Sequence, residues 1–245
     1  MHPLDNLTWT ALTTRQAEFS ESFGNARRFI PEVSPLGALE DPTREGYESL
    51  GRLVGAGGTI RLFLDTLYEA QAGWTLLNGS VMPEMVYEGV GLRPADSLFG
   101  SAQGRRGRLS SNEADPEIVE LGSADSAEMI ELTKLTRPGP FGKRTHELGT
   151  YLGIRHDGKL VAMAGERLKI PGYTEVSAVC THPEYTGRGY ARIMMTEVMR
   201  RILDRGETPF LHVREDNGRA IKLYQKLGFA TRVLLYTVGL RKDAS

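Results

Sequence analysis

Cysteine is almost missing from this sequence, which has 245 residues and one cysteine, Cys180. A single cysteine cannot form an internal disulfide, so we expect a reducing compartment. The five histidines form no closely spaced pair of the kind that metal-binding motifs use, and we predict no metal site. The histidine and cysteine content therefore gives no sign of a metalloprotein or of a disulfide-stabilised secreted domain.

Long apolar runs are missing too. No stretch reaches the length of a membrane-spanning helix, and the first residues lack the basic and apolar regions of a signal peptide. We therefore expect a cytoplasmic protein that does not bind membranes.

The sequence also lacks a strong charge of one sign, since its formal net charge is −1. Lysine and arginine number 10 against 15 acidic residues over positions 1–115, and 20 against 16 over positions 116–245. The excess of positive charge in the second part is too weak and dispersed for a nucleic-acid reader. It suits a small ligand that carries phosphates.

The most informative stretch joins a predicted strand, Tyr173–Thr181, to a predicted helix that begins at about Arg188. Gly187 and Gly189 lie at the junction. Backbone N–H groups at such a helix N-terminus point outward, and together with the helix dipole they bind anions. Glycine has no Cβ to block a phosphate that approaches the backbone. The stretch therefore predicts a phosphate-binding loop.

Three types of phosphate-binding loop compete for this stretch. The nucleotide-hydrolase loop G-x-x-x-x-G-K-[ST] does not occur, and the dinucleotide fingerprint needs a third glycine where the chain has Arg192. The third type is the pyrophosphate loop [QR]-x-x-G-x-[GA] of the GNAT superfamily of acyl-CoA-dependent N-acetyltransferases. Residues 186–191 resemble it at the glycine and the final small residue, but Thr186 replaces its Gln or Arg. On its own the loop also fits a plain turn that caps a helix.

A second stretch identifies the family. Residues 209–214 predict a strand, and the helix that follows has apolar residues at i, i+3, i+4 and i+7. Residues 213–229 closely resemble the second characteristic block of the superfamily, V-x-x-x-N-x-x-A-x-x-x-Y-x-x-x-G-F. With both motifs in this order, residues 117–245 are identified as a member of the GNAT superfamily. The residues before the glycines most resemble the branch of glycine N-acyltransferases.

The resemblance implies an α+β fold, the GNAT acyl-CoA N-acyltransferase fold, with a mixed, mostly antiparallel central sheet and flanking helices. We expect this domain over residues 117–245, a linker over 101–116, and a smaller α/β domain of unknown role over 1–100. The N-terminal pattern is compatible with a degenerate half-copy of the same fold. Its expected elements are helices over Leu7–Phe23 and Thr43–Leu53, and strands over Thr59–Leu64, Trp74–Leu77 and Met85–Tyr87.

The activity that the resemblance implies is transfer of an acetyl group from acetyl-CoA to a primary amine, by direct attack through a tetrahedral intermediate. The pantetheine arm would lie in a gap between the strands around 176–181 and 210–213. A backbone N–H near Val179 or Cys180 would stabilise the oxyanion, and Asn217 would contact the arm, cap its helix, or do both. The residues predicted to bind the cofactor are Val179, Cys180, Thr181, Gly187, Arg188, Gly189, Tyr190, Ala191, Arg192, Asn217 and Tyr224.

Tyr224 is the predicted general acid, because its phenol can give a proton to the departing thiolate. A purely structural role on the apolar face of its helix is the alternative. Glu175 is the first choice for the general base, followed by Glu166 and His146, although each could equally be a solvated or ion-paired group. No histidine pattern accompanies Cys180, so we expect a buried thiol there and no acyl-carrying nucleophile.

The acceptor is not determined by the sequence. A small amine, an amino acid, a polyamine and a protein N-terminus all stay open, as do the acyl chain length and a homodimeric state. The main alternative function is a CoA-binding regulatory module without catalysis, and an NAD-binding protein is a third. Thiol release separates the first two, and thermal stabilisation by NAD would indicate the third.

Overall fold

The computed structural model describes residues 2–89 and 116–244. Its main feature is an eight-stranded sheet in the order β4-β11-β5-β10-β9-β8-β7-β6. All neighbouring strands are antiparallel except β9 and β10, which are parallel. The strands are β4 (Thr59–Leu64), β5 (Trp74–Tyr87), β6 (Ile118–Leu121), β7 (Tyr151–His156), β8 (Lys159–Ile170), β9 (Tyr173–Thr181), β10 (Thr208–His212) and β11 (Phe229–Lys242).

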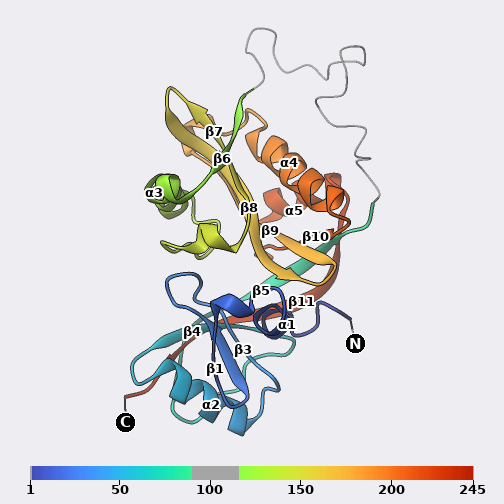
Figure 1. Ribbon diagram of the computed structural model, residues 1–245. Coiled ribbons are helices and arrows are strands. Elements are labelled where there is room, and N and C mark those ends of the chain that lie inside the picture. Colours follow the sequence, from blue (N-terminus) through green and yellow to red (C-terminus); the bar gives the residue numbers. More distant parts are fainter. Residues whose placement is uncertain (1, 90–115, 245) are drawn as a thin grey trace.

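Helices cover both faces of this sheet. The helices are α1 (Leu7–Thr13), α2 (Arg44–Val54), α3 (Ser126–Thr136), α4 (Tyr190–Asp204) and α5 (Gly218–Lys226). Helices α4 and α5 lie on one side of β8 and β9, and α3 lies on the other (Figure 1). A small antiparallel sheet with the order β1-β2-β3 packs against α2. Its strands are β1 (Ser20–Phe23), β2 (Ala26–Phe29) and β3 (Gly37–Leu39).

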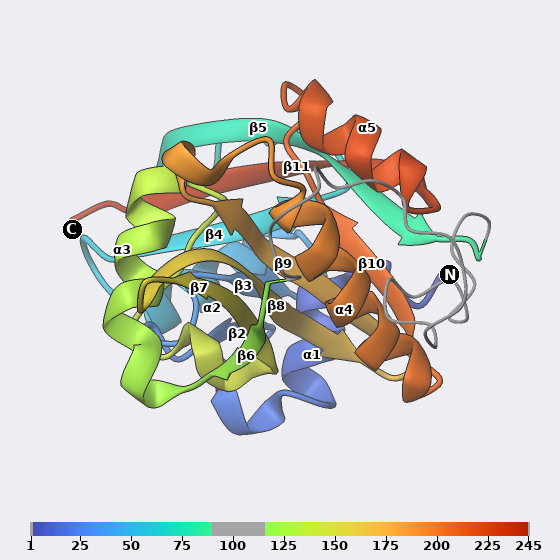
Figure 2. The ribbon, with the colours of Figure 1, turned by 90° about the horizontal axis from the view of Figure 1, so that it is seen from above.

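The helix α4 forms because its apolar residues recur at helical spacing and find a sheet to cover. Met194, Val198 and Ile202 are each at most 2% exposed and pack in one cluster with residues of β7, β8 and β10. Burial of side chains of this size stabilises the folded state by roughly 1.5–3 kcal/mol each. This packing fixes the N-terminus of α4 beside the end of β9, as the view from above shows (Figure 2).

The predicted helix over Leu7–Phe23 is wrong in its second half. The helix α1 ends at Thr13, and Ser20–Phe23 is the strand β1. Tertiary contacts override the local pattern here, because the buried side chain of Gln16 bonds to β8. Its Nε2 donates to the carbonyl of Arg167 at 2.7 Å, and its Oε1 accepts from the N–H of Lys169 at 3.1 Å.

The two short strands predicted over Trp74–Leu77 and Met85–Tyr87 are one strand, β5. The glycine and proline between them, Gly79 and Pro83, indicate a break in the sequence. The strand continues because it pairs with β11 along its whole length. The carbonyl of Pro83 accepts the N–H of Val213 at 3.1 Å, so the proline still contributes an acceptor.

Strands from both predicted domains belong to the same sheet. β5 lies between β10 and β11, and β4 pairs with β11. The long strands β5 and β11 run side by side from the small sheet to the region of α5 (Figure 1). The predicted linker over 101–116 lies outside the described residues except for Pro116. The division into two domains stays a prediction, but the sheet itself extends across it.

Two further findings concern the described residues alone. No helix within 2–89 or 116–244 has the length and apolar character needed to cross a membrane. The same residues contain no group of three or more His, Cys, Asp or Glu side chains placed to hold a metal ion.

Candidate active site

The parallel strands β9 and β10 separate after a short paired region. They pair only at Tyr173–Glu175 of β9 and Thr208–Phe210 of β10. From Val176 onward the β9 backbone has no β10 partner, so its N–H and C=O groups on that edge are available to a ligand. The gap lies where the sequence predicts it.

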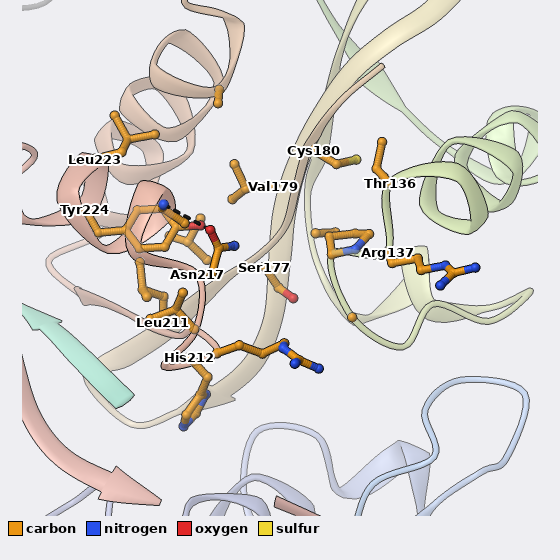
Figure 3. A pocket seen from close by; sticks show the side chains of 18 of the residues that line it. Thr136, Arg137, Ser177, Val179, Cys180, Leu211, His212, Asn217, Leu223 and Tyr224 are labelled. Carbon is orange, nitrogen blue, oxygen red and sulfur yellow. Dashed lines mark hydrogen bonds between the residues drawn. The ribbon is translucent and has the colours of Figure 1, made fainter. Parts of the chain in front are cut away.

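A cavity of about 880 Å³ occupies this gap and extends to both sides of it (Figure 3). Ten of the eleven residues predicted to bind the cofactor line it. The exception is Arg188, whose exposed guanidinium lies 5.1 Å from the ring centroid of Tyr185. The sequence therefore brings almost the whole predicted set to one place, although these residues come from β9, α4 and α5.

The cavity has a wall built from helix ends and a wall built from strands. The helix wall consists of lining residues 187–192 at the N-terminus of α4 and 217–224 of α5 and its cap. The strand wall consists of the lining residues of β4, β5 and β11, which are Arg61, Phe63, Ser80, Met82 and Thr237. The strand wall contains no residue that the sequence predicts for the site.

The N-terminus of α4 is open toward the cavity. Gly187 and Gly189 have φ angles of 84° and 81°, a conformation that other residues adopt at a cost. A Cβ added at either glycine would meet no atom within 4 Å, so backbone conformation is what requires glycine here. The first turn of α4 has no acidic residue and no side-chain cap. The positive end of the helix dipole is therefore available to an anion.

The strand β9 is kinked beside the gap, which the sequence does not reveal. Ala178 has a φ of 54°, unusual for a residue other than glycine. Ser177 pairs with Gly165 and Cys180 with Met163, so β9 carries one extra residue at this point. Such a bulge changes the direction of the backbone groups that follow it. Because the position is an alanine, no glycine marks the bulge in the sequence.

Asn217 caps α5, because its Oδ1 accepts the N–H of Ala220 at 3.2 Å (Figure 3). The structural interpretation of this residue is therefore confirmed. Asn217 also lines the cavity, and its side-chain NH₂ group is not used by the cap. A contact to a ligand remains compatible with the capping role.

Tyr224 points from α5 toward β9 (Figure 3) and is 9% exposed. Burial, together with the nearby thiol of Cys180, raises the pKa of Tyr224 to about 12, so the phenol is protonated at neutral pH. Burial also raises the pKa of Cys180 to about 11, although hydrogen bonds with Thr136 and Met163 oppose the shift. A thiol with this pKa is a poor nucleophile, in agreement with the expected buried role.

The surroundings of Glu175 do not fit its predicted role as the general base. Its side chain is 1% exposed, and Arg167 donates to its Oε1 at 2.6 Å and to its Oε2 at 2.8 Å. Burial would raise the pKa of Glu175, but Arg167 and His212 outweigh burial and lower it to about 2. A carboxylate of this pKa does not take up a proton near neutral pH. Glu175 is also absent from the cavity lining.

Glu175 instead belongs to a buried ionic chain, two members of which, Arg167 and His212, line the cavity. His212 places Nδ1 2.7 Å from Oε1 of Glu175 and Nε2 3.4 Å from Oε2 of Glu84. Arg232 donates to the other oxygen of Glu84 and bonds to Asp5 at 2.9 Å. Burial would lower the pKa of His212, but the two carboxylates outweigh burial and raise it. Cations and anions alternate along the whole chain when His212 is protonated, in the order Arg167, Glu175, His212, Glu84, Arg232 and Asp5.

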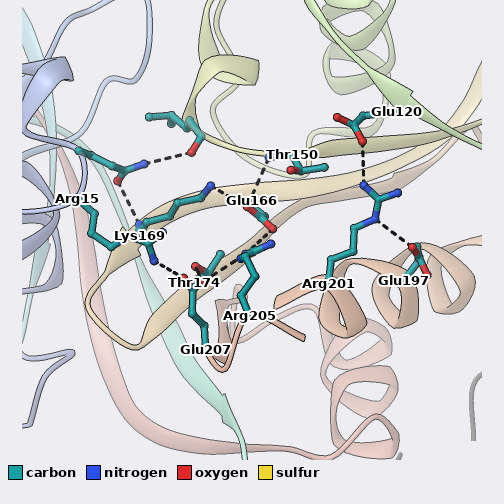
Figure 4. Close-up of polar contacts among 12 residues, drawn as sticks. Arg15, Glu120, Thr150, Glu166, Lys169, Thr174, Glu197, Arg201, Arg205 and Glu207 are labelled. Atoms are coloured by element: carbon teal, nitrogen blue, oxygen red, sulfur yellow. Dashed lines mark hydrogen bonds and ion pairs between the residues drawn. The ribbon is translucent and has the colours of Figure 1, made fainter. Parts of the chain in front are cut away.

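The second and third choices for a base are not in the cavity either. Glu166 is buried between Lys169 and Arg205, at 2.8 Å from each (Figure 4). His146 does not line the cavity. No aspartate or glutamate is found in the described lining at all. The lining has six arginines, Arg61, Arg137, Arg167, Arg192, Arg214 and Arg219, and the imidazole of His212, whose raised pKa favours the protonated form.

Comparisons with known proteins show which proteins this chain resembles. Residues 151–238 match the family model described as FR47-like protein. The chain is 34% identical over 145 residues to the N-alpha-acetyltransferase RimI of Mycobacterium tuberculosis, covering 53% of this chain and 85% of that protein. It is 33% identical to a putative acetyltransferase from the GNAT family of Novosphingobium aromaticivorans, whose crystal structure superposes over all of both chains with a TM-score of 0.83.

A tandem GNAT protein from the clavulanic acid biosynthesis pathway is a more distant structural relative. Its TM-score is 0.56 at 13% identity, covering 91% of this chain and 80% of that one, so it supports the fold alone. Together with the Novosphingobium structure, these similarities confirm the predicted fold, a mixed and mostly antiparallel sheet with flanking helices.

Proposed function

Because the chain belongs to the GNAT family of acetyltransferases, we propose that it transfers an acetyl group from acetyl-CoA to a primary amine. The observation that carries this proposal is the gap between β9 and β10 with the open N-terminus of α4 beside it. The narrower resemblance to glycine N-acyltransferases and a cytoplasmic location stay predictions.

The phosphates of the cofactor would bind the backbone N–H groups of residues 187–191, with Arg192 as a charge partner. The amide-rich pantetheine arm would pair with the free edge of β9 at Val179 and Thr181. Two observations support this fit. That edge has no strand partner, and the buried Oγ1 of Thr181 has no hydrogen-bond partner within the described residues. Bound there, acetyl-CoA supplies the activated acetyl group.

The backbone after the kink at Ala178 is our candidate for stabilising the oxyanion. A kinked strand can direct an N–H away from the sheet, and the N–H of Val179 comes directly after the unusual φ. Donors fixed in advance are effective because they need no reorganisation when charge develops. By comparison with single donors in other enzymes, loss of this N–H would lower the rate by roughly 10²-fold or more.

Tyr224 would donate a proton, or a strong hydrogen bond, to the departing thiolate. Burial raises the pKa of Tyr224 to about 12, so the phenol is protonated at neutral pH and its proton is available when the thiolate leaves.

The acceptor amine would lose its proton without a carboxylate base. An ammonium group near arginines is disfavoured, because like charges lower the pKa of an amine. The described lining presents six arginines and no acidic side chain. The amine would therefore enter as the neutral form, and the proton that its nitrogen cannot keep after attack on the thioester carbonyl would pass to water in the cavity. Water would then take the role of base that the sequence analysis assigns to Glu175.

The experiment that tests this function measures thiol release from acetyl-CoA with a panel of primary amines. Amine-dependent release supports an acetyltransferase. Stabilisation of the protein against heat by CoA, without thiol release for any amine, would instead support the regulatory module. Stabilisation by NAD but not by CoA would contradict both.

A further inference from the structure

The strand wall contains a cation that has no counter-ion. Arg61 of β4 is half-buried and lines the cavity. Its guanidinium donates to Oδ1 of Asn78 at 2.9 Å and to Oγ1 of Thr237 at 3.4 Å, and both acceptors are neutral. No carboxylate pairs with Arg61 among residues 2–89 and 116–244. Burial, and then the charge of Arg167, lower the pKa of Arg61, so its surroundings leave the cation uncompensated.

Arg167 lines the same cavity but differs from Arg61 in its pairing. Its charge is neutralised by the two-point contact with Glu175. Arg137, on the loop that follows α3, lies across β9 from Tyr224 (Figure 3) and is exposed. The excess positive charge of this part of the cavity therefore comes from Arg61, with a smaller contribution from the solvated Arg137.

The cofactor phosphates do not account for this charge. They are expected at the helix wall, where Arg192 and the α4 N-terminus lie, whereas Arg61 comes from β4, beyond β10, β5 and β11 in the sheet. A partly desolvated guanidinium is costly unless an anion pairs with it. Its planar fork matches a carboxylate by two parallel hydrogen bonds. The side chain is held in place by Asn78 and Thr237, which leaves its other N–H groups for a ligand.

We propose that the acceptor is an amine that also carries a carboxylate, and that Arg61 binds this carboxylate while the amine approaches the β9 kink. This inference rests on the proposed acetyl transfer and narrows its acceptor. It favours an amino acid, or a peptide with an acidic group near its N-terminus, and it disfavours a polyamine. A second ammonium group would be repelled by Arg61 and Arg137.

The test uses matched acceptors of equal chain length in the thiol-release assay. One set is 4-aminobutyrate, butylamine and 1,4-diaminobutane, which differ only in the group at the far end. The same comparison is made for shorter and longer chains, and for α-amino acids. A peptide arm compares dipeptides that have Asp or Glu in second position with those that have Asn or Gln. We expect kcat/KM to be highest for a carboxylate-bearing member, by about 10- to 100-fold.

Arg61→Gln should remove this preference by raising KM for the carboxylate-bearing acceptor about 10- to 100-fold. Its KM for acetyl-CoA and its rate with the matched alkylamine should change little. Arg137→Gln is the control, because it removes a solvated arginine of the same cavity and should have a much smaller effect. Arg61→Lys keeps the charge but loses the fork, and we expect an intermediate KM. Thermal unfolding of each variant shows whether it folds.

The outcomes separate this inference from the proposed function. If alkylamines or diamines are acetylated as well as the carboxylate-bearing amines at every length, the function stands and the inference fails. If no amine is acetylated, binding of butyrate to the CoA-loaded protein is measured by calorimetry. Binding that Arg61→Gln abolishes and Arg137→Gln retains would support the carboxylate site without catalysis. No butyrate binding to the native protein would overturn it.

Discussion

The helix wall and the strand wall enclose one cavity but are built in different ways. The helix wall offers backbone N–H groups and the dipole of α4, and its glycines have the φ angles that such a turn requires. The strand wall offers side chains, and Arg61 is its charged member. The helix wall comes from two continuous stretches. The strand wall joins residues as far apart as Arg61 and Thr237, which are 176 positions apart.

This difference suggests a division of tasks. Backbone donors at a helix end suit a ligand with a constant group, such as the diphosphate of a CoA thioester. Side chains on strands can change without altering the backbone, so they suit the part of a site that selects the acceptor. The ionic chain joins β8, β9, β10 and β5, so it connects the strands on both sides of the gap to one member of the strand wall.

The largest effect is expected from the ionic chain. Glu175→Gln removes the anion that neutralises Arg167 and His212, and leaves two buried cations side by side. We expect the free energy of unfolding in urea to fall by about 3–5 kcal/mol. Glu48→Gln, which breaks the exposed pair with Arg44, should not change it measurably. Equal stability of the two variants, with turnover lost only in Glu175→Gln, would restore Glu175 as the general base.

The next largest effect is a loss of turnover from a change in the helix wall. Tyr224→Phe should lower kcat by about 100-fold, because it removes the proton donor for the thiolate. The Kd for CoA should stay within about twofold, since the ring still packs. Cys180→Ala is the control and should retain most of the activity, because the thiol has no chemical role. Unchanged kcat in Tyr224→Phe would show that the tyrosine only fills space.

A third prediction concerns pH and the ionic chain. The pKa of Glu175 is lowered to about 2 in the folded state, so its stabilisation is present above its ordinary value of 4.5 and is lost as the pH falls toward 2. The pKa of His212 is raised above 6.5, so its stabilisation is present below pH 6.5 and is lost as the pH rises through the folded-state pKa. Urea unfolding should therefore show a plateau with losses on both sides.

The variant His212→Gln sharpens that measurement. It should remove the loss of stability on the alkaline side and keep the loss on the acid side. An unchanged alkaline slope in the variant would show that another group is responsible.

The smallest effect is expected at the cap of α5. Asn217→Ala should lower the free energy of unfolding by about 1 kcal/mol, because the N–H of Ala220 loses its acceptor. Asn217→Asp keeps an acceptor and should be nearly as stable as the native protein. If Asn217 also contacts the cofactor, both variants should bind CoA more weakly. Normal affinity in Asn217→Asp would limit the residue to capping.

Several elements of the fold could be predicted, because their signals are local. The strands β4 and β9 have the predicted bounds, and α2 begins after Thr43, whose side chain caps it. Each of these elements has its periodicity and its end signals within a few residues of one another.

The failures share a different cause. The predicted helix over Leu7–Phe23 stops because Gln16 bonds to β8, more than 130 positions away. The strand β5 continues through Pro83 because β11 pairs with it. The surroundings of Glu175 are likewise not visible in the sequence, because Arg167 and His212 meet it only where β8, β9 and β10 lie side by side. In each case a tertiary contact decides the outcome.

The sequence by itself determined the family, the glycine turn before α4 and most of the residues at the helix wall. It could do so because glycine conformation and helix periodicity are properties of short stretches. Only the tertiary structure decided the bulge at Ala178, the pairing of Glu175 and the place of Arg61 in the cavity. Sheet pairing and ion pairing depend on which strands lie next to one another, and no local pattern encodes that order.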